Sequence, residues 1–182
     1  MKETYGGIDV LVNNAGMAHN SSSTASFGEQ ATTTIATNYW ANKRACEILF
    51  PILKPGARVV NMSSSEGYLG HLGARGGDKN KAAVLKKRLS SDNLSVEELD
   101  GLMNNFVETA NAGTHGDHGW PNSTYVVSKI GWSALSRIQQ REMEKDSRKD
   151  IVINHVHPGY VDTDMTSHKG VLSIDRYVLL KE

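Results

Sequence analysis

Three short stretches of apolar residues, each followed by a polar or turn-forming cluster, stand out along the chain. Residues 8–12, 58–62 and 151–156 contain Val and Ile in the runs that are typical of buried parallel strands. Asn-Asn-Ala-Gly follows the first stretch, Ser-Ser-Ser follows the second and His-Pro-Gly follows the third. The pattern therefore predicts three buried strands, each ending at a turn.

Helical spacing of apolar residues fills the intervals between these strands. It runs through residues 27–53, where Pro-Gly then ends it, and through a short basic segment at residues 79–89. A capping-box sequence precedes a clear amphipathic helix at residues 96–110, and a long helix is predicted from Ser123 or Thr124 to Lys145. This order of elements predicts the α/β class, with a parallel sheet and right-handed crossovers.

Length and composition limit the possible classes of protein. A chain of 182 residues predicts one domain over residues 1–182, with residues 66–122 as a helical insert. Twenty basic and twenty acidic side chains cancel, which argues against a nucleic acid or an anionic membrane as partner. The chain has no run of ~18 apolar residues and no apolar signal core at its amino end. With Cys46 as its single cysteine, we expect a cytoplasmic protein.

The three predicted strand ends point to a ligand site. In parallel α/β sheets, ligands bind beyond the carboxyl ends of the strands. Small or polar clusters occupy all three of these ends, at residues 13–16, 63–65 and 158–163. Each cluster alone could be ordinary turn chemistry, whereas three clusters on one edge predict a site.

A Tyr placed four residues before a Lys brings a phenol and an ammonium group to one face of a helix. The ammonium favours the phenolate, so it should lower the pKa of the phenol and make it a usable proton donor near neutral pH. The spacing occurs at Tyr39/Lys43, Tyr125/Lys129 and Tyr177/Lys181. Only Tyr125 and Lys129 open a helix that leads into a strand ending in Pro-Gly, so we predict that this pair is the functional one.

Five motifs then follow one another along the chain. They are Asn13-Asn14-Ala15-Gly16, Asn38, Asn61-Met62-Ser63-Ser64, Tyr125-x-x-x-Lys129 and Pro158-Gly159-x-x-x-Thr163. In this order they resemble the short-chain dehydrogenase/reductase family, which implies a Rossmann-like parallel sheet with flanking helices. Gly119-Trp120-Pro121, Thr163-Asp164-Met165 and the 61 positions between Ser64 and Tyr125 resemble the monomeric carbonyl reductases of that family.

The resemblance implies a monomer that uses NADPH to reduce the carbonyl of a ketone, aldehyde or quinone to the alcohol. Ser64 would donate a hydrogen bond to the carbonyl oxygen, Tyr125 would protonate it, and Lys129 would hold the nicotinamide ribose. Asn38 would bind a water that returns protons through Lys129. The implied cofactor-binding residues are Asn14, Ala15, Gly16, Tyr125, Lys129, Pro158, Gly159, Val161 and Thr163. The implied substrate pocket contains Trp120, Tyr160 and Met165.

Parts of the family pattern have no counterpart in this sequence. The family opens with a strand, a Gly-rich turn and a helix that binds the cofactor phosphates, and nothing before Ile8 matches them. After residue 165 no clear final strand or helix follows. We therefore expect a sheet that is incomplete at the amino end and at the carboxyl end, and a first strand with an exposed edge.

Two other functions remain open from the sequence. A truncated, non-catalytic form could act as a binding protein or be an inactive fragment. An epimerase or dehydratase could share the Tyr-x-x-x-Lys spacing, although the long insert favours a carbonyl reductase. A metal site is not expected, since His115 and His118 lie in a glycine-rich loop and are interpreted as loop residues.

Overall fold

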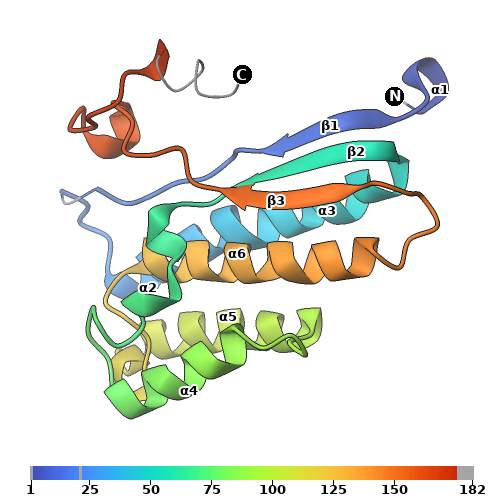
Figure 1. The fold of residues 1–182 in the computed structure, drawn as a ribbon. Helices are drawn as coiled ribbons and strands as arrows, with labels where there is room; N and C mark the ends of the chain where they lie inside the picture. Colours follow the sequence, from blue (N-terminus) through green and yellow to red (C-terminus); the bar gives the residue numbers. More distant parts are fainter. Residues whose placement is uncertain (1, 21, 176–182) are drawn as a thin grey trace.

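The computed structural model describes residues 2–20 and 22–175 (Figure 1). In this part of the chain, β1 (Ile8–Asn13), β2 (Leu53–Met62) and β3 (Val152–Val156) form a parallel sheet in the order β1-β2-β3. Asn13 pairs with Asn61, and Met62 pairs with Val156, so the three carboxyl ends lie nearly level. The predicted α/β class with a parallel sheet is confirmed.

Helices cover one face of the sheet (Figure 1). Along the chain, the short α1 (Lys2–Tyr5) precedes β1, and α2 (Phe27–Ile35) and α3 (Asn42–Leu49) connect β1 to β2. Helix α6 (Thr124–Met143) packs against β2 and β3. Helices α4 (Lys79–Leu89) and α5 (Val96–Asn111) lie on the far side of α6, away from the sheet (Figure 1). The insert thus builds a second helical layer, against which α2 and α6 pack.

The first long helix differs from its predicted form. Instead of one helix over residues 27–53, a π-helical turn, η1 (Ala36–Ala41), separates α2 from α3, and a 3₁₀ turn, η2 (Phe50–Ile52), follows α3. Strand β2 then begins at Leu53, five residues before the predicted start at residue 58. The early start includes the Pro-Gly pair, where Gly56 takes a positive φ and the β1–β2 register is irregular.

The remaining elements lie close to their predicted bounds. Helix α5 begins after Ser95, whose side chain accepts a hydrogen bond from the amide of Glu98. Helix α6 ends two residues before the predicted Lys145, and β3 begins one residue after the predicted start. Short 3₁₀ turns complete the described chain: η3 (Ser65–Gly67), η4 (Leu69–His71), η5 (His115–His118) and η6 (Asp164–Thr166).

Two apolar clusters hold these layers together. The larger one lies among α2, α5 and α6 and includes Ile35, Phe106 and Trp132, while the smaller one lies under β2 and β3. Strand β1 is an edge strand of the described sheet, as predicted, and Val10 and Val12 on it are 60% and 48% exposed. Among the described helices, none combines the length and apolarity that crossing a bilayer requires.

Candidate active site

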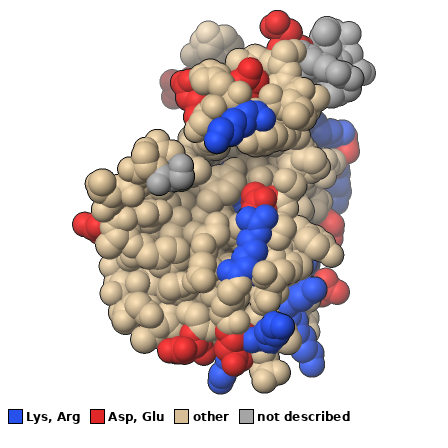
Figure 2. All heavy atoms as spheres, turned by 90° about the vertical axis from the view of Figure 1, so that its left-hand side faces the viewer, with Lys and Arg blue, Asp and Glu red and all other residues tan. Residues whose placement is uncertain are grey.

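A cavity of about 900 Å³ opens at the carboxyl ends of the strands. Loops after β1 and β2 and the first turns of α6 line one side, and residues 158–174 line the other. Figure 2 views the molecule from this edge of the sheet and shows a hollow in the surface below the upper part of the molecule. All the predicted site residues except Asn38 and Trp120 line this cavity, namely Asn14, Ala15, Gly16, Ser64, Tyr125, Lys129, Pro158, Gly159, Tyr160, Val161, Thr163 and Met165.

Lys129 lies one turn into α6, with its side chain directed at the end of β2. Its Nζ donates a hydrogen bond to the carbonyl oxygen of Met62 at 2.8 Å, and the residue is only 5% exposed. Burial disfavours the charged form of an amine, so it lowers the pKa of Lys129 to about 8. An amine with this pKa exchanges protons readily near neutral pH.

Tyr125 stands one helical turn before Lys129, and Lys129 Nζ lies 5.5 Å from the centre of its ring. Burial raises the pKa of Tyr125, a hydrogen bond with Ser64 lowers it, and the charge of Glu66 raises it further, for a net increase. The expected lowering of the Tyr125 pKa by Lys129 is therefore wrong for this structure. Burial would deprive a Tyr125 phenolate of its hydration. The Lys129 ammonium lies over the Tyr125 ring and donates a hydrogen bond to the Met62 carbonyl oxygen.

Ser64 caps the 3₁₀ turn after β2, where its Oγ accepts a hydrogen bond from the amide of Glu66 at 3.2 Å. This turn packs against α6, with Gly67 at the closest approach. A Cβ on Gly67 would lie 2.9 Å from Ser133 Oγ and 3.0 Å from the carbonyl oxygen of Lys129. The absence of a side chain at this glycine thus lets the serine-rich strand end lie against the helix that carries Tyr125 and Lys129.

Asn38 lies behind the cavity wall, in the π-helical turn η1. Its Oδ1 accepts from the amide of Met17 at 2.7 Å, and its Nδ2 donates to the carbonyl oxygen of Met17 at 2.8 Å and to Ser128 Oγ at 2.9 Å. A Cβ on Gly16 would lie 3.4 Å from Asn38 Oδ1 and 3.5 Å from Lys129 Nζ. Asn38 therefore fixes the loop after β1 next to the ammonium group, and its role in binding water stays a prediction.

Trp120 does not line this cavity, which corrects the expectation that it belongs to the substrate pocket. The side chain is fully buried, its Nε1 donates to Asn105 Oδ1 at 3.0 Å, and its ring packs on Phe106. The loop after α5 folds back onto that helix, because its glycines at positive φ, Gly113 and Gly119, reverse the chain there. Trp120 is thereby part of the helical core.

The sequence interpretation missed several residues that line the cavity. They are Ala18, Asn20, Met62, Glu66, Thr166, Ser167, Lys169 and Ile174, whereas Ser63 and Ser65, which also line it, belong to the predicted cluster at residues 63–65. Those beside a motif could have been found from their position next to it. Lys169 and Ile174 lie in a segment without a motif, and only the folding of that segment over the strand ends brings them to the cavity.

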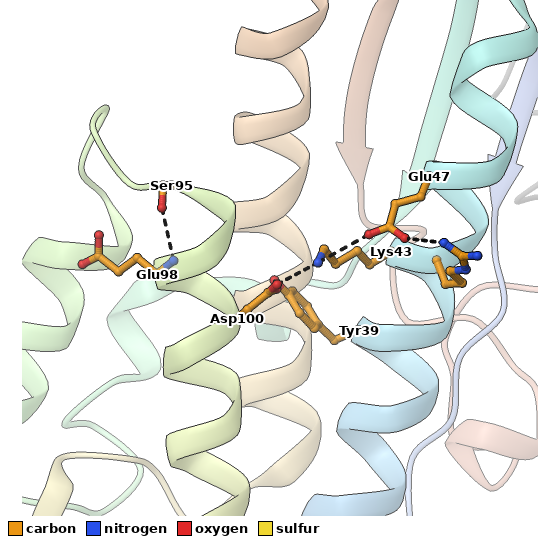
Figure 3. Close-up of polar contacts among 7 residues, drawn as sticks. Tyr39, Lys43, Glu47, Ser95, Glu98 and Asp100 are labelled. Atoms are coloured by element: carbon orange, nitrogen blue, oxygen red, sulfur yellow. Dashed lines mark hydrogen bonds and ion pairs between the residues drawn. The ribbon is translucent and has the colours of Figure 1, made fainter.

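The Tyr39/Lys43 pair does not line this cavity. Tyr39 is fully buried and its hydroxyl donates to Asp100 Oδ1 at 2.8 Å, while Lys43 Nζ donates to Asp100 Oδ2 at 2.7 Å (Figure 3). This pair therefore has a structural contact with α5. Tyr177 and Lys181 lie outside the described residues.

Comparisons with known proteins agree with this geometry. The family described as short chain dehydrogenase matches residues 1–85. Carbonyl reductase [NADPH] 1 from Rattus norvegicus is 42% identical over 172 residues, which cover 94% of this chain and 60% of that protein. The chain is thus similar to members of the short-chain dehydrogenase family. Carbonyl reductase [NADPH] 1 from Homo sapiens is 40% identical over 95% of this chain and 60% of its own length.

The chain thus spans about 60% of the length of the curated relatives that it matches. Among solved structures, salutaridine reductase from Papaver somniferum matches 98% of this chain and 68% of its own, with a TM-score of 0.80 and 23% identity. Menthone neomenthol reductase from Mentha piperita matches 92% of this chain and 65% of its own, with a TM-score of 0.66 and 24% identity. At these identities the two structures support the fold alone.

Proposed function

We propose that this chain carries the catalytic site of an NADPH-dependent carbonyl reductase, which reduces a ketone, aldehyde or quinone to the alcohol. The observation that carries the proposal is the convergence of Ser64, Tyr125 and Lys129 on one cavity at the carboxyl ends of the strands. The relatives named carbonyl reductase [NADPH] support both the reaction and the cofactor. The family's Tyr-x-x-x-Lys spacing supports the roles given to these residues.

The residues at the cavity fit a nicotinamide nucleotide. Gly16 leaves the space beside Asn38 and the Lys129 ammonium unfilled, because a Cβ there would reach within 3.5 Å of both. An ammonium group has three donors, and the contact with Met62 uses one of them. Lys129 would hold the ribose hydroxyls, and NADPH supplies the hydride when it is bound. Asn14, Ala15 and Gly16 would line its adenosine side, and Pro158, Gly159, Val161 and Thr163 would border its nicotinamide.

The side chains of this chain would supply the proton and stabilise the developing alkoxide. Ser64 would donate a hydrogen bond to the carbonyl oxygen, and Tyr125 would protonate the same oxygen. Because burial raises the pKa of Tyr125, its hydroxyl stays protonated at neutral pH and is ready to act as the donor. Lys129 would then return a proton toward Tyr125, replenished by a water near Asn38.

The roof of the cavity supports an apolar substrate. Tyr160, Met165 and Ile174 line it and are 49%, 50% and 57% exposed. Since exposed apolar side chains gain free energy on burial, they would cover the apolar part of a small-molecule carbonyl compound. Tyr160 and Met165 thus keep their proposed place in the substrate pocket.

The cellular setting follows the same resemblance. We propose a cytoplasmic monomer with one partial Rossmann-type domain over residues 1–182 and a helical insert at residues 66–122. The buried single thiol of Cys46 supports a reducing compartment. The insert, with α4 and α5 packed onto α2 and α6, supports the monomeric state by its similarity to the insert of the carbonyl reductases.

The experiment that tests the proposal follows NADPH oxidation by the purified chain in the presence of a quinone, with analysis of the product. We expect the hydroquinone to form, and Tyr125→Phe to lower kcat by ~10²–10⁴-fold, the usual contribution of a general acid. A parallel thermal unfolding series with NADPH should raise Tm in the wild type. Turnover that survives Tyr125→Phe, or unfolding that ignores millimolar NADPH, would contradict the proposal.

A further inference from the structure

A network of charged and polar side chains joins the insert to the turn behind the active site (Figure 3). Asp100 of α5 accepts two hydrogen bonds, one on each carboxylate oxygen: from the Tyr39 hydroxyl at 2.8 Å and from Lys43 Nζ at 2.7 Å. Lys43 also lies 3.5 Å from Glu47, which pairs with Arg44 at 3.0 Å. Both partners of Asp100 come from the segment that contains η1 and the start of α3.

Burial makes this network stronger than an ordinary surface ion pair. Tyr39 is fully buried, and the Lys43 and Asp100 side chains are only 17% and 22% exposed. Burial alone would lower the pKa of Lys43, but the hydrogen bonds and charges of Asp100 and Glu47 raise it overall. Without Asp100, a buried hydroxyl and a half-buried ammonium would lose their shared acceptor.

The turn that Asp100 holds is the turn that carries Asn38. Tyr39 follows Asn38 directly in η1, and a π-helical turn of this kind is a local irregularity often found at functional sites. Asn38 is bound on the inner side to both backbone groups of Met17 and to Ser128 Oγ. One short turn is therefore fixed from two sides, by Asp100 on the insert side and by Met17 on the side of the cavity.

The ring of Tyr39 also packs close to the catalytic helix. A Cβ on Gly131, two residues after Lys129, would lie 3.4 Å from Tyr39 Cδ2 and 2.5 Å from Met103 Sδ. Residues of η1, α5 and α6 thus meet directly beneath the first turns of α6. A displacement of Tyr39 would be felt both by Asn38 and by the helix that carries Lys129.

We propose that Asp100 is a positioning residue for the active site: through Tyr39 it holds the π-helical turn, so that Asn38 keeps the Met17 loop closed over the Lys129 ammonium. The meaning of this role rests on the proposed function. The contacts that transmit it do not require a bound cofactor. The helical insert then does more than build a second layer, because it fixes the geometry of the proton-return side of the site.

The test compares Asp100→Ala and Tyr39→Phe with a control, Glu98→Gln, in the full chain without NADPH. Glu98 lies on the same helix and pairs with Arg88, away from η1 (Figure 3). The first readout is the hydrogen-exchange rate of the Met17 amide, whose N–H donates a hydrogen bond to Asn38 Oδ1. The second is the pKa of Lys129, followed by NMR of labelled lysine side chains. Measured relative to the amides of β2, Met17 exchange reports local opening, and the Lys129 pKa reports the surroundings of the ammonium group, so a loss of global stability alone would not reproduce both changes.

Asp100→Ala and Tyr39→Phe should speed Met17 exchange ~10-fold or more relative to the amides of β2. Both should also move the Lys129 pKa upward from about 8, since a loosened loop readmits water to the ammonium. Glu98→Gln should change neither. Asp100→Asn, which keeps an acceptor for Tyr39, should restore part of the protection.

If the Asp100 and Tyr39 variants merely melt earlier, with Met17 exchange relative to β2 and the Lys129 pKa as in the wild type, the inference is overturned. Should Asp100→Ala fail to fold, Tyr39→Phe and Asp100→Asn give the same decision, because each removes only one contact of the carboxylate. Neither readout uses NADPH or turnover, so failure of the proposed reductase function would leave this result intact and would be seen separately.

Discussion

Lys129 is the residue whose replacement gives the sharpest test of the site's energetics. It is 5% exposed, and burial lowers its pKa from 10.5 to about 8. Each pKa unit corresponds to about 1.4 kcal/mol, so burial of the charged amine costs about 3 kcal/mol relative to the unfolded chain. A buried amine that lowers stability by this amount is expected where the chemistry of the site requires its positive charge.

We therefore predict that Lys129→Met stabilises the folded chain at pH 7, although it removes a residue of the proposed active site. Methionine has a similar unbranched shape without the charge, and the loss of the hydrogen bond to the Met62 carbonyl offsets the gain by about 1 kcal/mol. The expected net gain is about 2 kcal/mol. For a chain of this size, that raises Tm by about 4–8 °C.

The pH dependence gives the sign of the effect. The folded pKa of Lys129 lies below its unfolded value, so between pH 8 and pH 10.5 the unfolded chain holds more protons than the folded chain. The wild type therefore gains stability from this group as pH rises through that window. The advantage of Lys129→Met should be complete below pH 8 and should disappear by about pH 10.5.

The assay is urea unfolding at pH 7 and pH 10, followed by the fluorescence of the buried tryptophans. Lys43→Met is the matched control, because Asp100 and Glu47 raise the pKa of Lys43 overall. That variant should be less stable than the wild type at pH 7, and the difference should shrink as pH rises from the unfolded pKa of 10.5 through the raised folded pKa of Lys43. A Lys129→Met chain that is less stable at pH 7, or whose advantage is equal at both pH values, would refute the reasoning.

Three further substitutions separate core residues from cavity residues. Asn61→Ala should cost about 2–3 kcal/mol by urea unfolding, because Asn61 is fully buried between Asn13 and Ser136; a loss below 1 kcal/mol would contradict this. Trp120→Phe should lower stability by about 1–3 kcal/mol and leave the substrate KM unchanged; a changed KM would return Trp120 to the pocket. Gly16→Ala should leave Tm within a few degrees but weaken NADPH binding ~10-fold in a fluorescence titration. An unchanged affinity would contradict the proposal that the space beside Gly16 holds the cofactor.

The sheet and the place of Tyr125 and Lys129 at the cavity were predictable because their signals are local. Runs of Val and Ile mark the strands, and the residues that terminate each strand must lie at one edge of a parallel sheet. The side chain of Ser95 caps α5, as its spacing to Glu98 indicates. The choice among the Tyr/Lys pairs also came from local context, namely what precedes and follows each helix.

The π-helical turn and the place of Trp120 were not predictable in this way. A π-helical turn continues directly from helical backbone at Ile35 into helical backbone at Asn42 without a breaking residue, so residues 36–41 carry no separate signal. Trp120 follows a loop that reverses at Gly119, where the backbone packs closely against Lys81 and Ala82 of α4. Its neighbours in sequence belong to a family motif, but its side chain is committed to the core.

The electrostatics of the site also required the folded structure. From spacing alone, a Lys one turn after a Tyr should lower the phenol pKa. In the fold, the ammonium donates to Met62, and burial dominates at both groups. The depth of each side chain and the direction of the ammonium are tertiary properties that no sequence interval encodes.

Hydride transfer itself gives the most direct test of the proposed reductase function. The chain would be incubated with a ketone and NADPH that carries deuterium at the transferable position, and the alcohol would be analysed by mass spectrometry. The account predicts one deuterium on the carbinol carbon with the wild type, and at least ~10²-fold slower labelling with Tyr125→Phe. Unlabelled alcohol, no alcohol at saturating NADPH, or equal labelling by Tyr125→Phe would contradict it.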